Sequence, residues 1–165
     1  MILLGLGANL PSAMYGPPPA TLAGAIDALA AEGVALDRRS PWYRSAPLPA
    51  ADQPWFVNGV IAVTTRLAPA ELLAVLHLTE QRFGRHRRDR NEPRVLDLDL
   101  LDYHGRVEGG GGSPVALPHP RLHERAFVLL PLRDVAPDWH HPITGQSVDA
   151  LIAALPPGQQ IERIE

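Results

Sequence analysis

The chain has 165 residues, 45% of them hydrophobic and 20% charged, which predicts one soluble globular domain over residues 1–165 with a core of ordinary size. It has no cysteine, which excludes disulfides and thiolate chemistry, and all 15 basic residues are arginine, which excludes mechanisms that need a lysine. The net charge of −3 gives no general attraction to nucleic acid or anionic membranes. Any metal must be bound by Asp, Glu, His or water.

The first elements are expected in the order strand, helix. The apolar run at residues 1–7 is too short for a signal peptide or a membrane span, so we expect a cytoplasmic protein. Residues 2–7 instead predict a buried strand. Residues 21–31 have apolar side chains at helical spacing and predict a helix that ends at Gly33.

The middle of the chain predicts a hairpin, a helix and a further strand. A second strand is expected over residues 34–43 and a third over residues 56–65, which are rich in Val, Ile and Thr. The proline-rich residues 46–54 between them form the long loop of the hairpin. A helix follows over residues 69–84, with a proline at its first position, and then a strand over residues 95–103.

The order βαββαβ predicts an α+β fold with a ferredoxin-like core, in which an antiparallel sheet has both helices on one face. Beyond this core, residues 109–112 are all glycine and predict a flexible link. Pro118-His119-Pro120 predicts a rigid kink. Residues 123–132 and 148–155 predict additional C-terminal helices.

Asp97 and Asp99 are the strongest candidates for chemistry. They lie two residues apart on a predicted strand, so both carboxylates point to one face while the neighbouring leucines point to the other. Uncompensated like charges there are destabilising, whereas one or two carboxylates and a substrate phosphate form a typical Mg²⁺ site. An exposed sheet face neutralised by nearby arginines is the alternative. Asp102 has the opposite parity, which predicts that it supports the pair indirectly or is solvated.

The segment before this strand is rich in arginine, with five in residues 85–94. One guanidinium group can bind two phosphate oxygens at once, and it remains charged at all working pH values. An arginine-rich loop beside two carboxylates therefore predicts binding of a polyphosphate with Mg²⁺. A solvated charge run and a local nucleic-acid patch are the alternatives.

Two further features are weaker evidence for a binding site when each is considered alone. His119 is held between two prolines and can bind a phosphate, but a surface histidine is the commoner case. Phe56 and Asn58 share one face of a strand, and a ring beside an amide can recognise a flat heteroaromatic ligand. Ordinary strand packing is the alternative and is favoured by these two residues alone.

Several segments, in this order along residues 2–140, resemble the 6-hydroxymethyl-7,8-dihydropterin pyrophosphokinase family of folate biosynthesis. The most specific feature is the combination of the last two of them. The segments are Gly7-Ala8-Asn9-Leu10, Tyr43-Arg44-Ser45-Ala46-Pro47-Leu48, Asp52-Gln53-Pro54-Trp55-Phe56-Val57-Asn58, Gly84-Arg85, Pro93-Arg94-Val95-Leu96-Asp97-Leu98-Asp99-Leu100 and Pro118-His119-Pro120-Arg121-Leu122-His123-Glu124-Arg125-Ala126-Phe127.

The resemblance implies a reaction and the groups that carry it. The two terminal phosphates of ATP pass as a unit to the hydroxymethyl oxygen of the reduced pterin, by in-line attack on the β-phosphorus, and AMP leaves. As catalytic residues it implies Asp97 and Asp99, which hold two Mg²⁺ ions, and Arg85 and Arg94, which neutralise developing charge. The expected partners are these two small-molecule substrates, without nucleic acid or membrane, and the expected oligomeric state is a monomer.

The resemblance also implies the substrate contacts. ATP is expected to contact Glu80, Arg85, Arg87, Arg94, His119 and Arg125. The pterin is expected to contact Ser45, Ala46, Leu48, Phe56, Asn58 and Phe127, with the two phenylalanine rings on either side of it.

The chain departs from some relatives in ways that concern ATP affinity and loop closure rather than the type of reaction. Asn91-Glu92 stands where a number of relatives have Trp-Gly, Pro114 replaces an arginine, and His77 replaces a glutamine. Two other functions stay open on the residues alone. A ferredoxin-like RNA-binding or regulatory module gives no reason for Asp97 and Asp99, and a nucleotidyl transferase would release pyrophosphate instead of AMP.

Overall fold

The computed structural model describes residues 1–84 and 94–165. Its elements in chain order are β1 (Ile2–Ala8), α1 (Pro18–Ala31), β2 (Ala35–Arg39), β3 (Tyr43–Ser45), β4 (Phe56–Thr64), α2 (Pro69–Arg82), β5 (Asp97–Tyr103), a 3-10 turn (Leu122–Glu124), α3 (Ala126–Val135), α4 (Val148–Ala153) and β6 (Ile161–Arg163).

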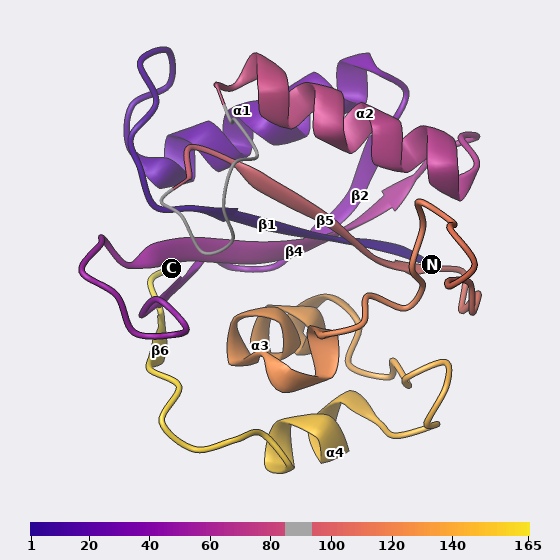
Figure 1. Cartoon of the computed structure of the whole chain (residues 1–165). Helices are drawn as coiled ribbons and strands as arrows, with labels where there is room; N and C mark the ends of the chain where they lie inside the picture. Colours follow the sequence, from indigo (N-terminus) through magenta and orange to yellow (C-terminus); the bar gives the residue numbers. More distant parts are fainter. Residues whose placement is uncertain (85–93) are drawn as a thin grey trace.

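The strands form one antiparallel sheet in the order β5-β1-β4-β3-β6, and β2 also pairs with β4. Helices α1 and α2 cover one face of this sheet, while α3 and α4 lie on the opposite face (Figure 1). The first five strands and two helices have the predicted ferredoxin-like arrangement, with the additional C-terminal helices on the second face. The fold class predicted from the sequence is therefore confirmed.

The core has two parts because the central strand β1 is buried on both faces. Leu4 and Leu6 pack with the residues of α1 and α2, whereas Leu3 packs with those of α3 and α4. This alternation follows from the two-residue period of a strand. In the part of the chain that the structure describes, no helix has both the length and the apolar character needed to cross a bilayer.

The predicted second strand is in fact two strands, β2 and β3, interrupted at residues 40–42. Pro41 has no backbone N–H for the sheet. The Ser40 hydroxyl donates to Pro41 O (2.8 Å) and accepts from Val60 N of β4 (3.0 Å). The two halves continue to pair with β4 on either side of this interruption. The hairpin prediction was correct, but the continuous strand was not.

Among the other differences from the predictions, two concern the start of a helix and one is an additional strand. Helix α1 begins at Pro18 because prolines are tolerated in the first turn of a helix, where an N–H has no intrahelical partner. Arg125 has an extended backbone, which separates the 3-10 turn from α3 and shifts this helix to residues 126–135. Strand β6 was not predicted.

Candidate active site

A row of paired residues crosses the sheet on the side of α3. Gly7 of β1 pairs with Asp97 of β5 and with Asn58 of β4, and Asn58 pairs with Tyr43 of β3. Residues paired directly across an antiparallel sheet point to the same face. A Cβ atom on Gly7 would lie only 3.0 Å from the Asn58 Oδ1 atom. The glycine therefore lets the Asn58 amide lie close against the backbone of β1.

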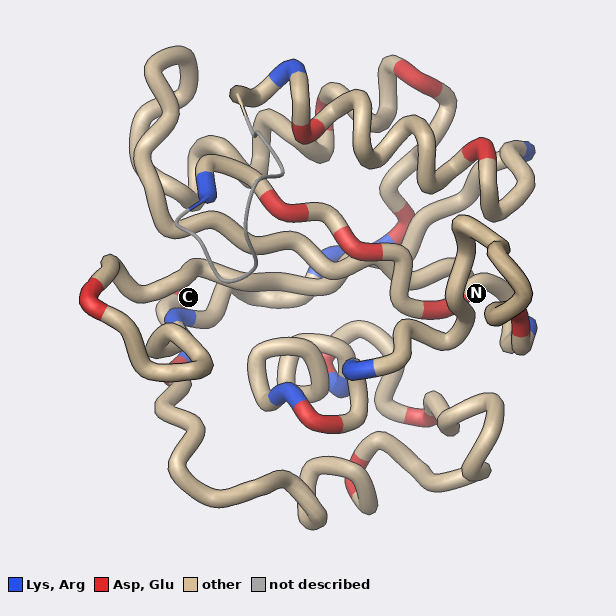
Figure 2. The backbone as a smooth tube through the Cα atoms, in the orientation of Figure 1, with Lys and Arg blue, Asp and Glu red and all other residues tan. Residues whose placement is uncertain are grey.

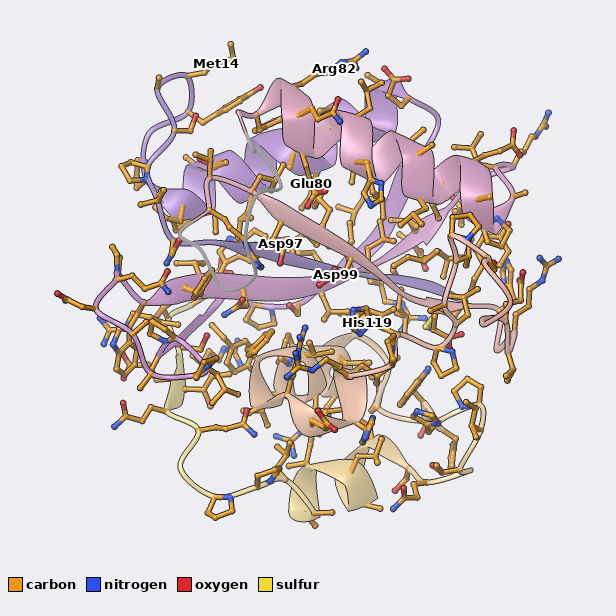
Figure 3. All side chains as sticks on the ribbon, in the orientation of Figure 1. Met14, Glu80, Arg82, Asp97, Asp99 and His119 are labelled. Carbon is orange, nitrogen blue, oxygen red and sulfur yellow. The ribbon has the colours of Figure 1, made fainter. Side chains whose placement is uncertain are left out.

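Asp97 and Asp99 share this face, as their spacing predicted. Figure 2 shows the acidic positions along β5, and Figure 3 shows Asp97 and Asp99 following one another there, with His119 on the side of α3. Arg94 Nη1 donates to Asp97 Oδ2 over 2.8 Å, and Asp99 Oδ1 lies 4.0 Å from His119 Nε2. The structure thus brings together four residues that the sequence analysis placed in the catalytic and ATP sites.

His119 is fixed by its own backbone and by its ring. Its backbone N–H donates to Leu101 O (2.9 Å), and its Nδ1 accepts from Arg121 N (3.2 Å). The proton of the neutral ring is therefore on Nε2, which faces Asp99. Burial and the positive charge of Arg125 lower the pKa of His119 to about 4, against the opposite effect of Asp97. His119 is consequently a neutral hydrogen-bond donor at neutral pH.

Arg125 belongs to the same electrostatic environment. Burial lowers the pKa of Arg125, and the charges of Asp99 and Asp97 oppose that shift. Because a guanidinium stays protonated at neutral pH, Arg125 adds a partly buried positive charge close to both carboxylates. Its guanidinium carbon also lies 5.5 Å from the centroid of the Phe127 ring. Arg125 therefore interacts both with the carboxylate region and with the aromatic ring expected to contact the pterin.

Glu80 has a different environment from the one expected of an ATP contact. Only 1% of it is exposed, and its Oε2 accepts a hydrogen bond from Leu98 N (2.9 Å). Leu98 lies between the two aspartates on β5, which is an edge strand of the sheet. Glu80 thus binds an outward-facing N–H of that strand and holds in place the segment that carries Asp97 and Asp99. A direct contact with ATP stays a prediction.

The two carboxylates fit a magnesium ion better than a metal that needs a complete protein cage. Among residues 1–84 and 94–165 no group of three or more His, Asp and Glu side chains is placed to hold a metal. The side chains of Asp97 and Asp99 are 20% and 31% exposed, so their oxygens can be reached. Mg²⁺ usually keeps several waters and takes one or two carboxylates together with substrate phosphates. This donor set therefore suits Mg²⁺ bound jointly with a phosphorylated ligand.

Asp102 lies on a different face of β5 from the one that strand parity predicted. The pairing between β1 and β5 shifts so that Leu4 pairs with Leu100 but Leu3 pairs with Asp102, which is a β-bulge at Leu101. The bulge turns Asp102 toward α3, where it is 4% exposed and accepts from Trp139 Nε1 (2.7 Å). It also accepts from the backbone N of Gly105 (2.9 Å). Asp102 is a buried structural acceptor and is not solvated.

The residues expected to contact the pterin are divided between a cavity and the layer behind it. Ser45, Ala46, Leu48 and Phe127 line a small cavity between β3 and the start of α3, together with residues 158–161. Asn58 does not line this cavity: it is 5% exposed, and its Nδ2 donates to Ser45 Oγ over 2.6 Å. Phe56 is half-buried and pairs with Ser45.

Sequence reasoning missed two contributors to this region. One is Asn9, which is 2% exposed and whose Nδ2 donates to Gln53 Oε1 (2.8 Å) and Pro54 O (2.9 Å) of the hairpin loop. Its Oδ1 accepts from Arg94 N over 2.7 Å. A polar residue directly after a buried strand was the available signal. The other contributor is the segment at residues 158–161, for which the sequence offered none. Arg85, Arg87 and the Asn91-Glu92 departure lie outside the described residues.

Comparisons with known proteins agree with this geometry. The family model for 7,8-dihydro-6-hydroxymethylpterin-pyrophosphokinase (HPPK) matches residues 3–137. A 2-amino-4-hydroxy-6-hydroxymethyldihydropteridine pyrophosphokinase of Methylorubrum extorquens is 42% identical over 163 residues, which cover 98% of this chain and 97% of that protein. The enzyme of the same name from Synechocystis is 40% identical over 151 residues, covering 91% of this chain and 73% of that one.

Solved structures give the same fold at low sequence identity. The wild-type HPPK-DHPS of Plasmodium falciparum superposes with a TM-score of 0.69 at 12% identity, over 93% of this chain and 44% of that one. The present chain thus spans less than half of that solved protein. The fold, the carboxylate pair and the surrounding arginines define a ferredoxin-like domain suited to a metal-bound phosphate ligand. With the match over residues 3–137, the chain belongs to the HPPK family.

Proposed function

We propose that this chain transfers the terminal diphosphate of ATP to the hydroxymethyl oxygen of 6-hydroxymethyl-7,8-dihydropterin and releases AMP, as a step of folate biosynthesis. Its family and its most similar relatives, which are named pyrophosphokinases, support this reaction. The observation that carries the proposal is the grouping of Asp97, Asp99, Arg94 and His119 on one sheet face. That face continues through Gly7 to Asn58 and Ser45.

The nucleotide is assigned to the β5 side of this face. Asp97 and Asp99 would hold two Mg²⁺ ions, which when bound neutralise the triphosphate and align the attacking and leaving oxygens. Arg94 and Arg125 supply fixed positive charge next to the carboxylates, and His119 Nε2–H supplies a neutral donor. The proposal also gives Arg85 and Arg87 a role in binding the phosphates. Catalysis by these groups is positioning and charge stabilisation, without a covalent enzyme intermediate.

The pterin is assigned to the other end of the face. The rings of Phe56 and Phe127 would stack on the flat heterocycle, and the Asn58 amide with the backbone at Ser45 to Leu48 would satisfy its polar edge. The hydroxymethyl oxygen then attacks the β-phosphorus while the bond to the α-phosphate oxygen breaks and AMP departs. The proposal includes a single pyrophosphokinase domain that acts as a monomer in the cytoplasm.

Product analysis tests the reaction. The protein is incubated with ATP, Mg²⁺ and 6-hydroxymethyl-7,8-dihydropterin, with controls that omit the pterin or the metal, and the nucleotides are separated by chromatography. AMP that forms only when all three are present supports the proposal. Release of pyrophosphate would identify a nucleotidyl transferase, and release of ADP a single-phosphate kinase. The absence of both turnover and pterin binding would reject an enzyme function on this substrate.

A further inference from the structure

The last residues of the chain take part in the wall of the cavity described above. Residues 158–161 line it together with Ser45, Ala46 and Phe127. They lie beyond residues 3–137, the part that the family model matches. This C-terminal segment leads from α4 to β6 (Figure 1).

The side chain of Gln159 binds the start of α3 by two hydrogen bonds. Its Oε1 accepts from Ala126 N over 2.9 Å, and its Nε2 donates to Glu124 O over 2.9 Å. Ala126 is the first residue of α3, so its backbone amide has no acceptor within the helix. The side chain of the N-cap residue, Arg125, makes no capping hydrogen bond. Gln159 thus acts as a helix cap supplied from far along the chain, directly before Phe127.

The backbone of the same segment binds the opposite wall. Ala46 N donates to Gln160 O over 3.0 Å, and Ser45 pairs with Ile161 at the start of β6. Consecutive residues of one short segment therefore join β3 and the hairpin loop on one side to the start of α3 on the other. The rest of α3 is held on the sheet by its apolar side chains and by the hydrogen bond from Tyr43 to Asp134 near its other end. Since the two bonds of the Gln159 side chain hold the start of the helix, their loss would loosen the Phe127 wall relative to the Ser45 wall.

We propose that Gln159 is a positioning residue for the pterin, because it fixes the distance between the Phe127 wall and the Ser45 wall of the cavity. The inference rests on the proposed function, which assigns the pterin to these walls. Gln159 acts through α3 and touches neither the carboxylates nor Arg94. Its contribution is to order the site before the ligand arrives, so that binding does not have to supply this ordering.

The test uses two substitutions and one control in the full chain. Gln159→Ala removes both hydrogen bonds, and Gln159→Met removes them while keeping most of the side-chain volume. Gln146→Ala truncates an exposed glutamine on a different loop and serves as the control. Binding of 6-hydroxymethylpterin, the stable oxidised form, is measured from its own fluorescence, and KM and kcat are measured with the dihydropterin.

We expect both Gln159 variants to raise the pterin Kd and KM about tenfold, as loss of preorganisation does, while kcat changes by less than about twofold. The control should match the wild type. An unchanged pterin Kd in Gln159→Met would overturn the inference and leave the proposed function standing. An equal loss of kcat and of affinity for both substrates would also overturn it, as a general structural effect. If the wild type neither binds the pterin nor turns over the dihydropterin with ATP and Mg²⁺, the proposed function fails and the inference fails with it.

Discussion

Asn9 and the backbone of Arg94 are joined by two hydrogen bonds, one through the Asn9 side chain and one through its backbone. Arg94 N donates to Asn9 Oδ1 over 2.7 Å, and Asn9 N donates to Arg94 O over 2.9 Å. The amide group of Asn9 also donates twice to the hairpin loop at Gln53 and Pro54. One buried asparagine at the end of β1 therefore connects the loop expected to bind the pterin with the arginine that leads into the carboxylate strand.

We expect Asn9→Ala to weaken both stability and pterin binding. It leaves the Arg94 amide and the Pro54 carbonyl without their partner, which costs about 1–3 kcal/mol for a buried polar group. Urea unfolding monitored by circular dichroism should show this loss, and the pterin KM should rise as the hairpin loop is released. Asn9→Asp keeps the acceptor for Arg94 but loses both donors, so its stability should fall as well. A stable Asn9→Ala protein with unchanged KM contradicts the proposed connection.

Substitutions of three aspartates should separate chemistry from stability. Asp97→Asn and Asp99→Asn keep the side-chain shape but remove the charges expected to hold Mg²⁺, so AMP production should fall at least about a hundredfold with the melting temperature nearly unchanged. Asp102→Ala leaves the indole N–H of Trp139 without an acceptor, so it should lower stability by about 1–3 kcal/mol. The remaining folded Asp102→Ala protein should turn over normally.

Two outcomes would contradict these assignments. Near-normal activity of either asparagine variant with Mg²⁺ would remove that carboxylate from the metal site. A large loss of activity in folded Asp102→Ala, without a change in melting temperature, would assign Asp102 a role in catalysis.

Gly7→Ala should disturb the amide of Asn58. The added methyl group would lie 3.0 Å from Asn58 Oδ1, so the amide has to shift by a few tenths of an ångström, and we expect this shift to weaken its hydrogen bond to Ser45. We expect a stability loss of about 1–3 kcal/mol, typical of overpacking, and weaker pterin binding in the fluorescence assay. Gly5→Ala is the matched control on the same strand, because its methyl group would meet Leu101 at an ordinary 3.5 Å. Equal effects of the two substitutions would refute a specific role of Gly7.

The stability of the metal-free protein should fall as the pH drops below about 6.5, in part through His141. Its Nδ1 accepts from Ile143 N (3.2 Å) and Thr144 N (3.3 Å), which a protonated ring cannot do. Burial and the neighbouring His123 lower the pKa of His141 below the usual 6.5, against the effect of Asp102. The unfolded chain therefore takes up this proton first. The contribution to stability is complete above pH 6.5 and decreases below it, by up to about 1.4 kcal/mol per pH unit.

Variants isolate that contribution. His119 titrates in the same sense, so the difference between proteins is the quantity to measure by denaturant unfolding at several pH values. His141→Asn offers an amide oxygen to the same backbone amides without titrating, and its pH dependence should be flatter than that of the wild type. His140→Asn, at an exposed neighbouring position, should keep the full slope. A wild-type slope in His141→Asn would exclude this histidine as the origin.

The sequence was most informative where a long element has its own pattern. The helices expected at residues 21–31 and 69–84 and the strand expected at residues 56–65 were found by periodicity, with ends that differ by one to three residues from α1, α2 and β4. The shared face of Asp97 and Asp99 follows from the same reasoning. Strand β6 has only three residues and forms because the edge of β3 is available to it, which no local pattern records. The contacts of Asn9 likewise depend on a loop that returns from about 45 residues away.

The β-bulge at Leu101 also separates the carboxylate of Asp102 from those of Asp97 and Asp99. Without Leu101, Asp102 would take the next position on the face of Asp97 and Asp99, and three carboxylates would follow one another at two-residue spacing. Leu101 instead occupies that position with an apolar side chain, in the cluster that contains Leu3. The third negative charge is moved onward to an indole N–H. Leu101 therefore keeps the third carboxylate away from Asp97 and Asp99. This limits the negative charge that cations bound to these two residues would have to neutralise.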